Sequence, residues 1–377
     1  MSPTRTRNVL AAAGLAALVP LGWSGIRAAR EAHATQARAA TVCPRPDAIG
    51  AQSAMTPPSA LAATGHVFAS HGSSGKRVSI IDLATGRVTT LPAGIGDPHE
   101  VAVSPDGRWG VAADFGDYKG DYKFDGHRLA VFDLTAKRLA RVIELGTYLG
   151  PHEIVFHPTS PNRAFVTAQT TQHVVEVDVE AGRVLGATET RAVGSHTMAV
   201  TGDGRTGFTA NEPEATVSRL DFVRRAFVAK YRVGAGQTEG IGVTPDGREV
   251  WVAFVKEGVV RVVDGNTGAV LATVEGFMSP MRLALSPDGS RAVISDGGCK
   301  VAQVADVRAR RVLGPIAGLD GNIGAARVLP DNRTAVIAVL PEGIVAMVDL
   351  EERRVISRFD LDGWVDAVGW GPGSIPR

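Results

Sequence analysis

One short phrase recurs through the chain and constrains its fold more than any other feature. It reads Pro-His-Glu-Val-Ala-Val-Ser-Pro-Asp-Gly at 98–107 and returns in variant copies that begin at residues 151, 195, 238, 280, 323 and 365. The Pro or Gly that forms the turn of each copy falls 42 to 53 residues after the previous one. A structural unit that repeats at a period near 43 is typical of the blades of a β-propeller. The seven copies therefore predict seven blades.

Each repeat reads as four short β-strands. In the repeat that begins at residue 98, they are expected over 100–104, 109–113, 128–134 and 138–145, which are rich in apolar residues and separated by Gly, Asp and Pro. The last copy supplies only an inner strand, whereas residues 66–91 supply three strands without an inner one. We therefore predict an all-β fold, a seven-bladed β-propeller over 65–377. It would be closed by pairing the N-terminal strands with the C-terminal inner strand, which removes exposed sheet edges.

An aspartate ends the third strand of every repeat. These residues are Asp82, Asp133, Asp178, Asp221, Asp264, Asp306 and Asp349. Seven spaced carboxylates could indicate catalysis or calcium binding, but each stands where one strand turns into the next. An aspartate side chain at such a place accepts hydrogen bonds from the backbone N–H groups of the turn. We therefore predict a turn-forming role for all seven.

The hairpin at 78–86, Val-Ser-Ile-Ile-Asp-Leu-Ala-Thr-Gly, and the recurring Ser-Pro-Asp-Gly turn resemble the YVTN-type β-propeller repeat family. The resemblance extends over roughly 65–377, although Phe254 and Val339 depart from the family's asparagine-like residue at the end of the second strand. It implies a propeller fold. Such propellers include surface-layer proteins, periplasmic binding proteins, metal chaperones and relatives of the haem d1 propeller, so the resemblance does not select one function.

The N-terminus has the order of a secretory signal. Arg5 and Arg7 precede an apolar stretch over 9–23, and small residues follow near Ala34. The stretch is short for a bilayer crossing, which favours a cleaved signal peptide over 1–34 rather than an uncleaved anchor. We therefore expect an arm over 35–64 before the propeller. The protein would be exported to the periplasm, the cell surface or the medium, without membrane contact beyond the signal segment.

Charge and cysteine content limit the partners. The chain has 40 Lys and Arg against 39 Asp and Glu, without a long basic run, so nucleic-acid binding is not expected. Cys43 and Cys299 are the only cysteines. In an oxidising compartment they could pair, and the alternative is two separate thiols. We expect a monomer.

One inner-strand position carries metal-ligand side chains in most repeats. Two places before the first apolar residue of each inner strand stand His99, His152, His196, Glu239, Met281, Gly324 and Asp366. On this face of a propeller the loops surround the mouth of the central channel. Imidazole and carboxylate groups bind zinc and copper. We predict His99, His152 and His196 as primary metal contacts with Glu239 and Asp366 as carboxylate partners, the alternative being that these side chains are polar only because they face water.

Further ligand-binding candidates adjoin this ring. They are His71, Glu100, Asp114, His127, Glu153, Met281 and Arg282. Glu100, Glu153 and Arg282 form a second ring one residue along the inner strands, and only one of the two rings is expected to point fully into the channel. Asp114 and His127 bound a loop with about nine extra residues and paired aromatics. It suits a lid or a protein-binding loop, and a solvated insertion is the alternative.

The predicted function is that of a binding protein that captures a metal ion or a small ligand at the channel mouth. The sequence has no Gly-x-Ser-x-Gly elbow, no His-Glu-x-x-His motif, no phosphate-binding loop and no Cys-x-x-Cys-His haem site. Two other functions stay open. One is a lyase or hydrolase in which His99 or His152 acts as the general base. The other is a surface scaffold that binds a protein partner through the 114–127 loop.

Overall fold

The computed structural model describes residue 43 and the ranges 64–319 and 321–373. The predicted signal peptide over 1–34 and, apart from Cys43, nearly all of the arm over 35–64 lie outside these residues. No helix within the described ranges is long and apolar enough to cross a membrane.

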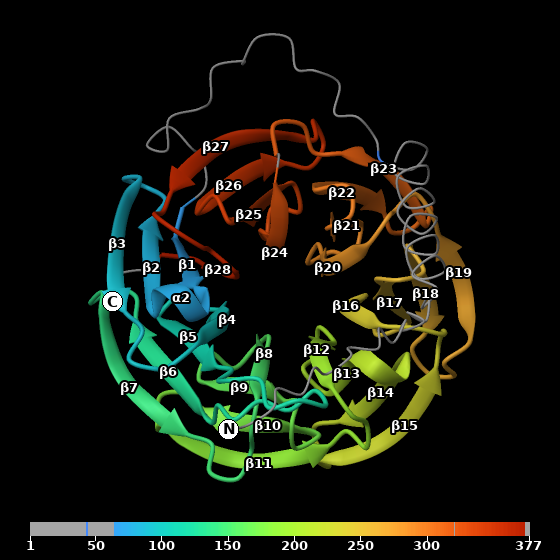
Figure 1. The fold of residues 1–377 in the computed structure, drawn as a ribbon, viewed down its shortest axis with the longest axis horizontal. Coiled ribbons are helices and arrows are strands. Elements are labelled where there is room, and N and C mark those ends of the chain that lie inside the picture. The colour runs from blue at the N-terminus through green and yellow to red at the C-terminus, as the bar shows by residue number, and fades with distance from the viewer. Residues whose placement is uncertain (1–42, 44–63, 320, 374–377) are drawn as a thin grey trace, which may run out of the picture. The chain divides into compact units, whose positions relative to one another are not determined.

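Seven four-stranded antiparallel sheets form a ring, as the repeat predicts (Figure 1). We number these blades I to VII in chain order. Blade I contains β28 (Val368–Gly371), β1 (His66–His71), β2 (Arg77–Asp82) and β3 (Arg87–Pro92). Blade II contains β4 (Pro98–Val103), β5 (Trp109–Asp114), β6 (Arg128–Asp133) and β7 (Arg138–Glu144). Blade III contains β8 (Pro151–Phe156), β9 (Arg163–Ala168), β10 (His173–Asp178) and β11 (Arg183–Glu189). Blade IV contains β12 (Ser195–Val200), β13 (Thr206–Asn211), β14 (Thr216–Asp221) and β15 (Ala226–Arg232).

The remaining blades follow the same plan, with the first-named strand innermost. Blade V contains β16 (Thr238–Val243), β17 (Glu249–Phe254), β18 (Val259–Asp264) and β19 (Val270–Val274). Blade VI contains β20 (Pro280–Leu285), β21 (Arg291–Asp296), β22 (Val301–Asp306) and β23 (Arg311–Pro315). Blade VII contains β24 (Asn322–Val328), β25 (Thr334–Leu340), β26 (Ile344–Asp349) and β27 (Arg354–Asp360). Two short helical turns, α2 (Gly72–Gly75) and η2 (Glu212–Glu214), lie between strands.

Blade I is built from segments at the two ends of the described chain. Its inner strand β28 pairs antiparallel with β1, with Gly371 opposite His66 and Val368 opposite Ala69. The side chains of Val67, Ala69 and Val368 are fully buried in one apolar cluster with residues of blade VII. The backbone hydrogen bonds of this pairing and the apolar contacts around it therefore join blade I to its neighbour.

The predicted turn role of the seven aspartates is confirmed. Asp82 accepts hydrogen bonds from the backbone N–H groups of Ala84 and Thr85, and each of the other six bonds its own turn in the same way. The Pro-Asp-Gly turn between the first and second strands is fixed similarly, because Asp106 accepts bonds from the N–H of Arg108 and the hydroxyl of Ser104. These carboxylates are used locally and are not available for a shared metal site.

Irregular pairing at the start of the inner strands decides where the candidate residues point. In six blades the register between the first and second strands shifts at this place, for example between Pro98 and Val101 in blade II. His99 and Glu100 therefore both lie outside the regular ladder. A bulge of this kind releases consecutive side chains from the strict alternation of a strand.

Cys43 and Cys299 form a disulfide, which settles the two alternatives that the sequence left open. The bond links residues 256 positions apart and ties the segment before the propeller to the loop between β21 and β22.

Candidate functional site

The inner strands of blades II, III and IV bring three histidine rings into a row at the channel mouth. We call the mouth the end of the propeller at which the inner strands begin. The ring centroids of His99 and His152 are 4.9 Å apart, and those of His152 and His196 are 3.8 Å apart. The three imidazoles that the sequence predicts as primary contacts are thus neighbours in space.

His152 is the central ring of the row. Its side chain is completely buried, and neither Nδ1 nor Nε2 has a partner among the described residues. Burial lowers the pKa of His152 well below its usual value of 6.5, and the positive charges of His196, His99 and Arg282 act in the same direction. The ring is therefore neutral at pH 7, and a buried polar group left without a partner is costly.

His99 is oriented by a carboxylate. Its Nδ1 lies 2.9 Å from Oδ2 of Asp366, which precedes β28 in blade I. Burial alone would lower the pKa of His99, but the nearby Asp366 carboxylate outweighs it and raises the pKa above 6.5. With Nδ1 bonded to Asp366, the other nitrogen, Nε2, is free to act as a metal ligand or a base once it is deprotonated.

His196 is held at both ring nitrogens. Its Nδ1 lies 2.8 Å from Oε1 of Gln169, and its Nε2 lies 3.2 Å from Oε1 of Glu239. A second carboxylate, Glu212 in η2, comes within 3.8 Å of Nδ1. Burial would raise the pKa of Glu239, but His196 and Arg282 lower it to about 2. Glu239 is therefore ionised at pH 7, and its carboxylate faces Nε2 of His196.

Two ion pairs cross the channel below the histidines. Arg282 of blade VI donates to Glu100 of blade II at 2.7 Å, and Arg327 of blade VII donates to Glu153 of blade III at 3.0 Å. The two residues of each pair come from blades that are separated by two other blades along the shorter path around the ring. A cavity of only about 20 Å³ remains beside them, which is room for about one water. The channel is therefore filled at this depth.

The two side-chain rings that the sequence predicts at the channel make different contacts. His99 contacts its neighbours at the mouth, while the adjacent Glu100 reaches across the channel to Arg282. The register shift at the start of β4 explains the difference, because it releases both residues from the strand ladder.

The 114–127 loop packs over the histidine row. The Phe115 ring stacks on His99 with centroids 5.0 Å apart and meets His152 edge-on at 4.7 Å. Phe124 covers Phe115 at 3.6 Å, and its backbone N–H donates to the hydroxyl of Thr170 in blade III. The loop therefore lies as a strap over the mouth and is anchored to the next blade. Tyr118 at its tip is 62% exposed.

Four of the predicted ligand-binding residues make contacts away from the histidine row. His71 bonds Ser79 within blade I, and His127 faces Glu144 at the exposed end of β7. Asp114 accepts two hydrogen bonds from Arg128 and one from the N–H of Asp97, so it fixes the entry to β4. The Met281 sulfur packs against Gly297. A Cβ atom added to Gly297 would lie only 2.8 Å from this sulfur. No contact recorded among the described residues joins these four side chains to His152.

Three residues of the mouth were not predicted from the sequence. Gln169 directly follows β9, the second strand of blade III. Glu212 lies in η2, and Phe115 begins the long loop. All three follow second strands rather than precede inner strands, so comparing inner-strand positions could not find them. Their common signal is a polar or aromatic residue at the entrance to a loop on the mouth side.

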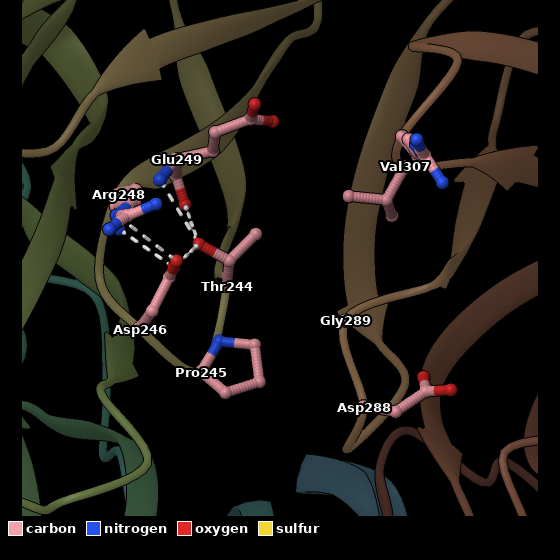
Figure 2. Close-up of a pocket in the computed structure, with 9 residues that line it drawn as sticks. Thr244, Pro245, Asp246, Arg248, Glu249, Asp288, Gly289 and Val307 are labelled. Carbon is pink, nitrogen blue, oxygen red and sulfur yellow. Dashed lines mark hydrogen bonds and ion pairs between the residues drawn. The ribbon is translucent and has the colours of Figure 1, made fainter.

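An open cleft lies at the opposite end of the blades (Figure 2). It has a volume of about 460 Å³ and lies between the first turns of blades V and VI, with Pro245 and Gly289 on its two walls. Asp246 in its wall already accepts hydrogen bonds from Thr244 and Arg248 of its own turn. None of the predicted site residues lines this cleft.

Comparisons with known proteins support the class of fold. The chain is similar to a solved structure titled Kuenenia stuttgartiensis Hydrazine Synthase, with 17% sequence identity and a TM-score of 0.62. The match covers 84% of this chain and 99% of the other. At this identity the likeness concerns the fold alone. A scan against protein-family models found no match, and a search of curated proteins found no significant one. The fold and the site define a seven-bladed β-propeller protein with a polar, histidine-lined mouth.

Proposed function

We propose that this protein is an exported propeller of the YVTN type that binds a transition-metal cation, zinc or copper, at its channel mouth. The single observation that carries the proposal is His152, a neutral, fully buried ring between two other histidines, whose two nitrogens have no hydrogen-bond partner among the described residues. A metal ion bound to one of these nitrogens would give it the partner that it lacks. Imidazole with carboxylate oxygen is a ligand set suited to zinc or copper.

The charge of the mouth favours a cation over an anion. Six carboxylates lie in and below the histidine row, and two guanidinium groups lie among them. The carboxylates are Asp97, Glu100, Glu153, Glu212, Glu239 and Asp366, and the guanidinium groups are Arg282 and Arg327. When these eight groups are ionised and the three histidines are neutral, as metal binding requires, the excess is four negative charges. An anionic ligand would add to this repulsion, whereas a cation relieves it.

Export is supported by two independent features. The sequence begins with the order of a secretory signal, and Cys43 and Cys299 form a disulfide, which persists in oxidising compartments such as the periplasm or the cell exterior.

Replacing His152 with phenylalanine is expected to weaken zinc binding about 100-fold or more, because an aromatic ring is kept while the ligand nitrogen is lost. Isothermal titration of the purified protein with Zn²⁺ and with Cu²⁺ measures the change, and urea unfolding checks that the variant is folded. His127→Phe is the matched control, since that ring is exposed and lies outside the histidine row. Equal affinities in the wild type and the His152 variant would contradict the proposal.

Zinc affinity is expected to fall as the pH drops through the raised pKa of His99, so the decline begins above pH 6.5. Protonated imidazole cannot bind a metal ion. Asp366, Glu100 and Asp97 favour the protonated ring and Arg282 opposes it, with Asp366 the strongest charge. In Asp366→Asn the decline should therefore move to lower pH. Dissociation constants measured from pH 5.5 to 8.5 test this, and an unchanged midpoint in the variant would argue against the Asp366 effect.

General-base catalysis by His99 is a second candidate, favoured by the same Asp366 contact. An aspartate that holds Nδ1 leaves Nε2 as the base in the way that a lyase or hydrolase requires. The zinc titration separates the two, because a base without a metal role predicts no dependence of metal binding on His152.

A further inference from the structure

We propose that the mouth holds two cations in adjacent sites rather than one. Site A consists of His99, Glu100 and His152, and site B consists of His196, Glu212 and Glu239. The proposal rests on the proposed function and deepens it. It replaces a single ion under three histidines with two ions that share none of their protein ligands.

The distances separate the six ligands into two sets. Within each set, one ligand atom per residue lies within 4.8 Å of those of the other two residues. Ligand atoms that share one tetrahedral zinc ion at 2.0 to 2.2 Å lie about 3.3–3.6 Å apart. Each set would therefore have to contract by about 1 Å through side-chain rotation to close around an ion.

Each site has its own supporting residues. In site A, Asp366 bonds Nδ1 of His99, and Arg282 bonds Oε1 of Glu100. In site B, Gln169 bonds Nδ1 of His196 and so leaves Nε2 directed at Glu239. Groups that bind metals in proteins usually have such an outer partner, which fixes the ring or carboxylate in the binding orientation. The two sets are therefore oriented by different side chains.

His152 supplies an independent indication of a ligand in site A. It is fully buried and both of its nitrogens lack a partner among the described residues, although Glu100 and His99 lie within reach of one of them. Most buried polar side chains in proteins are satisfied by protein or water. An ion bound in site A would give one of these two nitrogens a partner.

The charge excess also fits two divalent ions. With four more negative than positive groups around the mouth, one divalent cation would leave two charges uncompensated, whereas two would balance the set. Both sites combine imidazole with carboxylate oxygen, the ligand mixture that Zn²⁺ accepts, so Zn²⁺ is the natural probe.

The number of bound ions tests the inference. Protein saturated with Zn²⁺ and freed of excess metal is expected to contain two zinc ions per chain by elemental analysis. His99→Phe, which damages site A, and the double variant Glu212→Gln/Glu239→Gln, which damages site B, should each retain one ion. The control Asp117→Asn changes a carboxylate that is 88% exposed in the loop and should retain two. Urea unfolding confirms that each variant is folded.

The outcomes distinguish this inference from the proposed function. One ion in the wild type, lost in both variants, would overturn the pair of sites and leave the proposed function standing. No bound ion would overturn both. Two ions that neither variant affects would place the metal elsewhere and would also overturn both. With Cu²⁺ as the probe, the electron paramagnetic resonance spectrum should show coupling between neighbouring ions in the wild type and an isolated ion in His99→Phe.

Discussion

Replacing Arg282 with methionine is expected to lower the free energy of unfolding by about 3–5 kcal/mol, the cost of leaving a buried charge without its partner. The Glu100 side chain is only 3% exposed and its Oε1 accepts the Arg282 hydrogen bond at 2.7 Å. Methionine fills much of the volume of the arginine stem but returns no charge. Equilibrium unfolding in urea at pH 7 measures the change.

Two further variants make this prediction specific to the buried pair. Arg224→Met removes an arginine that is 78% exposed and paired with Asp221, and it should change stability by less than about 1 kcal/mol. The double variant Arg282→Met/Glu100→Leu removes both charges and should recover most of the stability lost in the single variant. A double variant as unstable as Arg282→Met would show that the loss comes from packing rather than from the unpaired carboxylate.

Replacing Val368 with aspartate is expected to destabilise the protein by about 4 kcal/mol or more. The Val368 side chain is fully buried in the apolar cluster that joins β28 to blade VII, and a carboxylate there has no cationic partner among the described residues of that cluster. Since β28 is the inner strand of blade I, its release would leave β1 with an unpaired edge.

Val142→Asp is the matched control, because Val142 lies on an outer strand and is 37% exposed. It should cost less than about 1 kcal/mol. Urea unfolding measured by fluorescence and by circular dichroism follows both variants. Similar losses in the two would mean that the β28 contacts contribute little to the stability of the ring.

The blade architecture was predictable because it depends on local, repeated chemistry. The Pro-Asp-Gly turn and the aspartate that ends each third strand fix the two turns of the blade through their own backbone, as Asp82 and Asp106 do. Such signals need no knowledge of the rest of the chain. The period of the repeat then gives the number of blades.

The site was only partly predictable because its contacts join different blades. Comparing equivalent positions on the inner strands predicted that His99, His152 and His196 lie close together, and their rings are neighbours in the structure. The partners of these rings come from elsewhere in the blades, however, and Gln169 illustrates why they were missed. Its position after a second strand gives no hint that it bonds a histidine of the next blade.

His71 shows a second limit, that of side-chain direction. It ends β1, the second strand of blade I, and its ring bonds Ser79 inside its own sheet. Side-chain direction at a strand end depends on the local twist and on the available partners, and neither can be read from the repeat. The bulges that let both His99 and Glu100 leave the ladder are equally hidden, because they have no residue signature of their own here.

The ion pairs that cross the channel change how the repeats depend on one another. In an ordinary repeat protein each unit contacts only its neighbours, so a local opening can spread or stop one unit at a time. Here Arg282 and Glu100 connect blades VI and II, and Arg327 and Glu153 connect blades VII and III. The blades of each pair are not neighbours in the ring. Opening any of these four blades removes a support from a blade that it does not touch along the rim. Unfolding of the ring is therefore expected to be more cooperative than a sum of nearest-neighbour contacts would give.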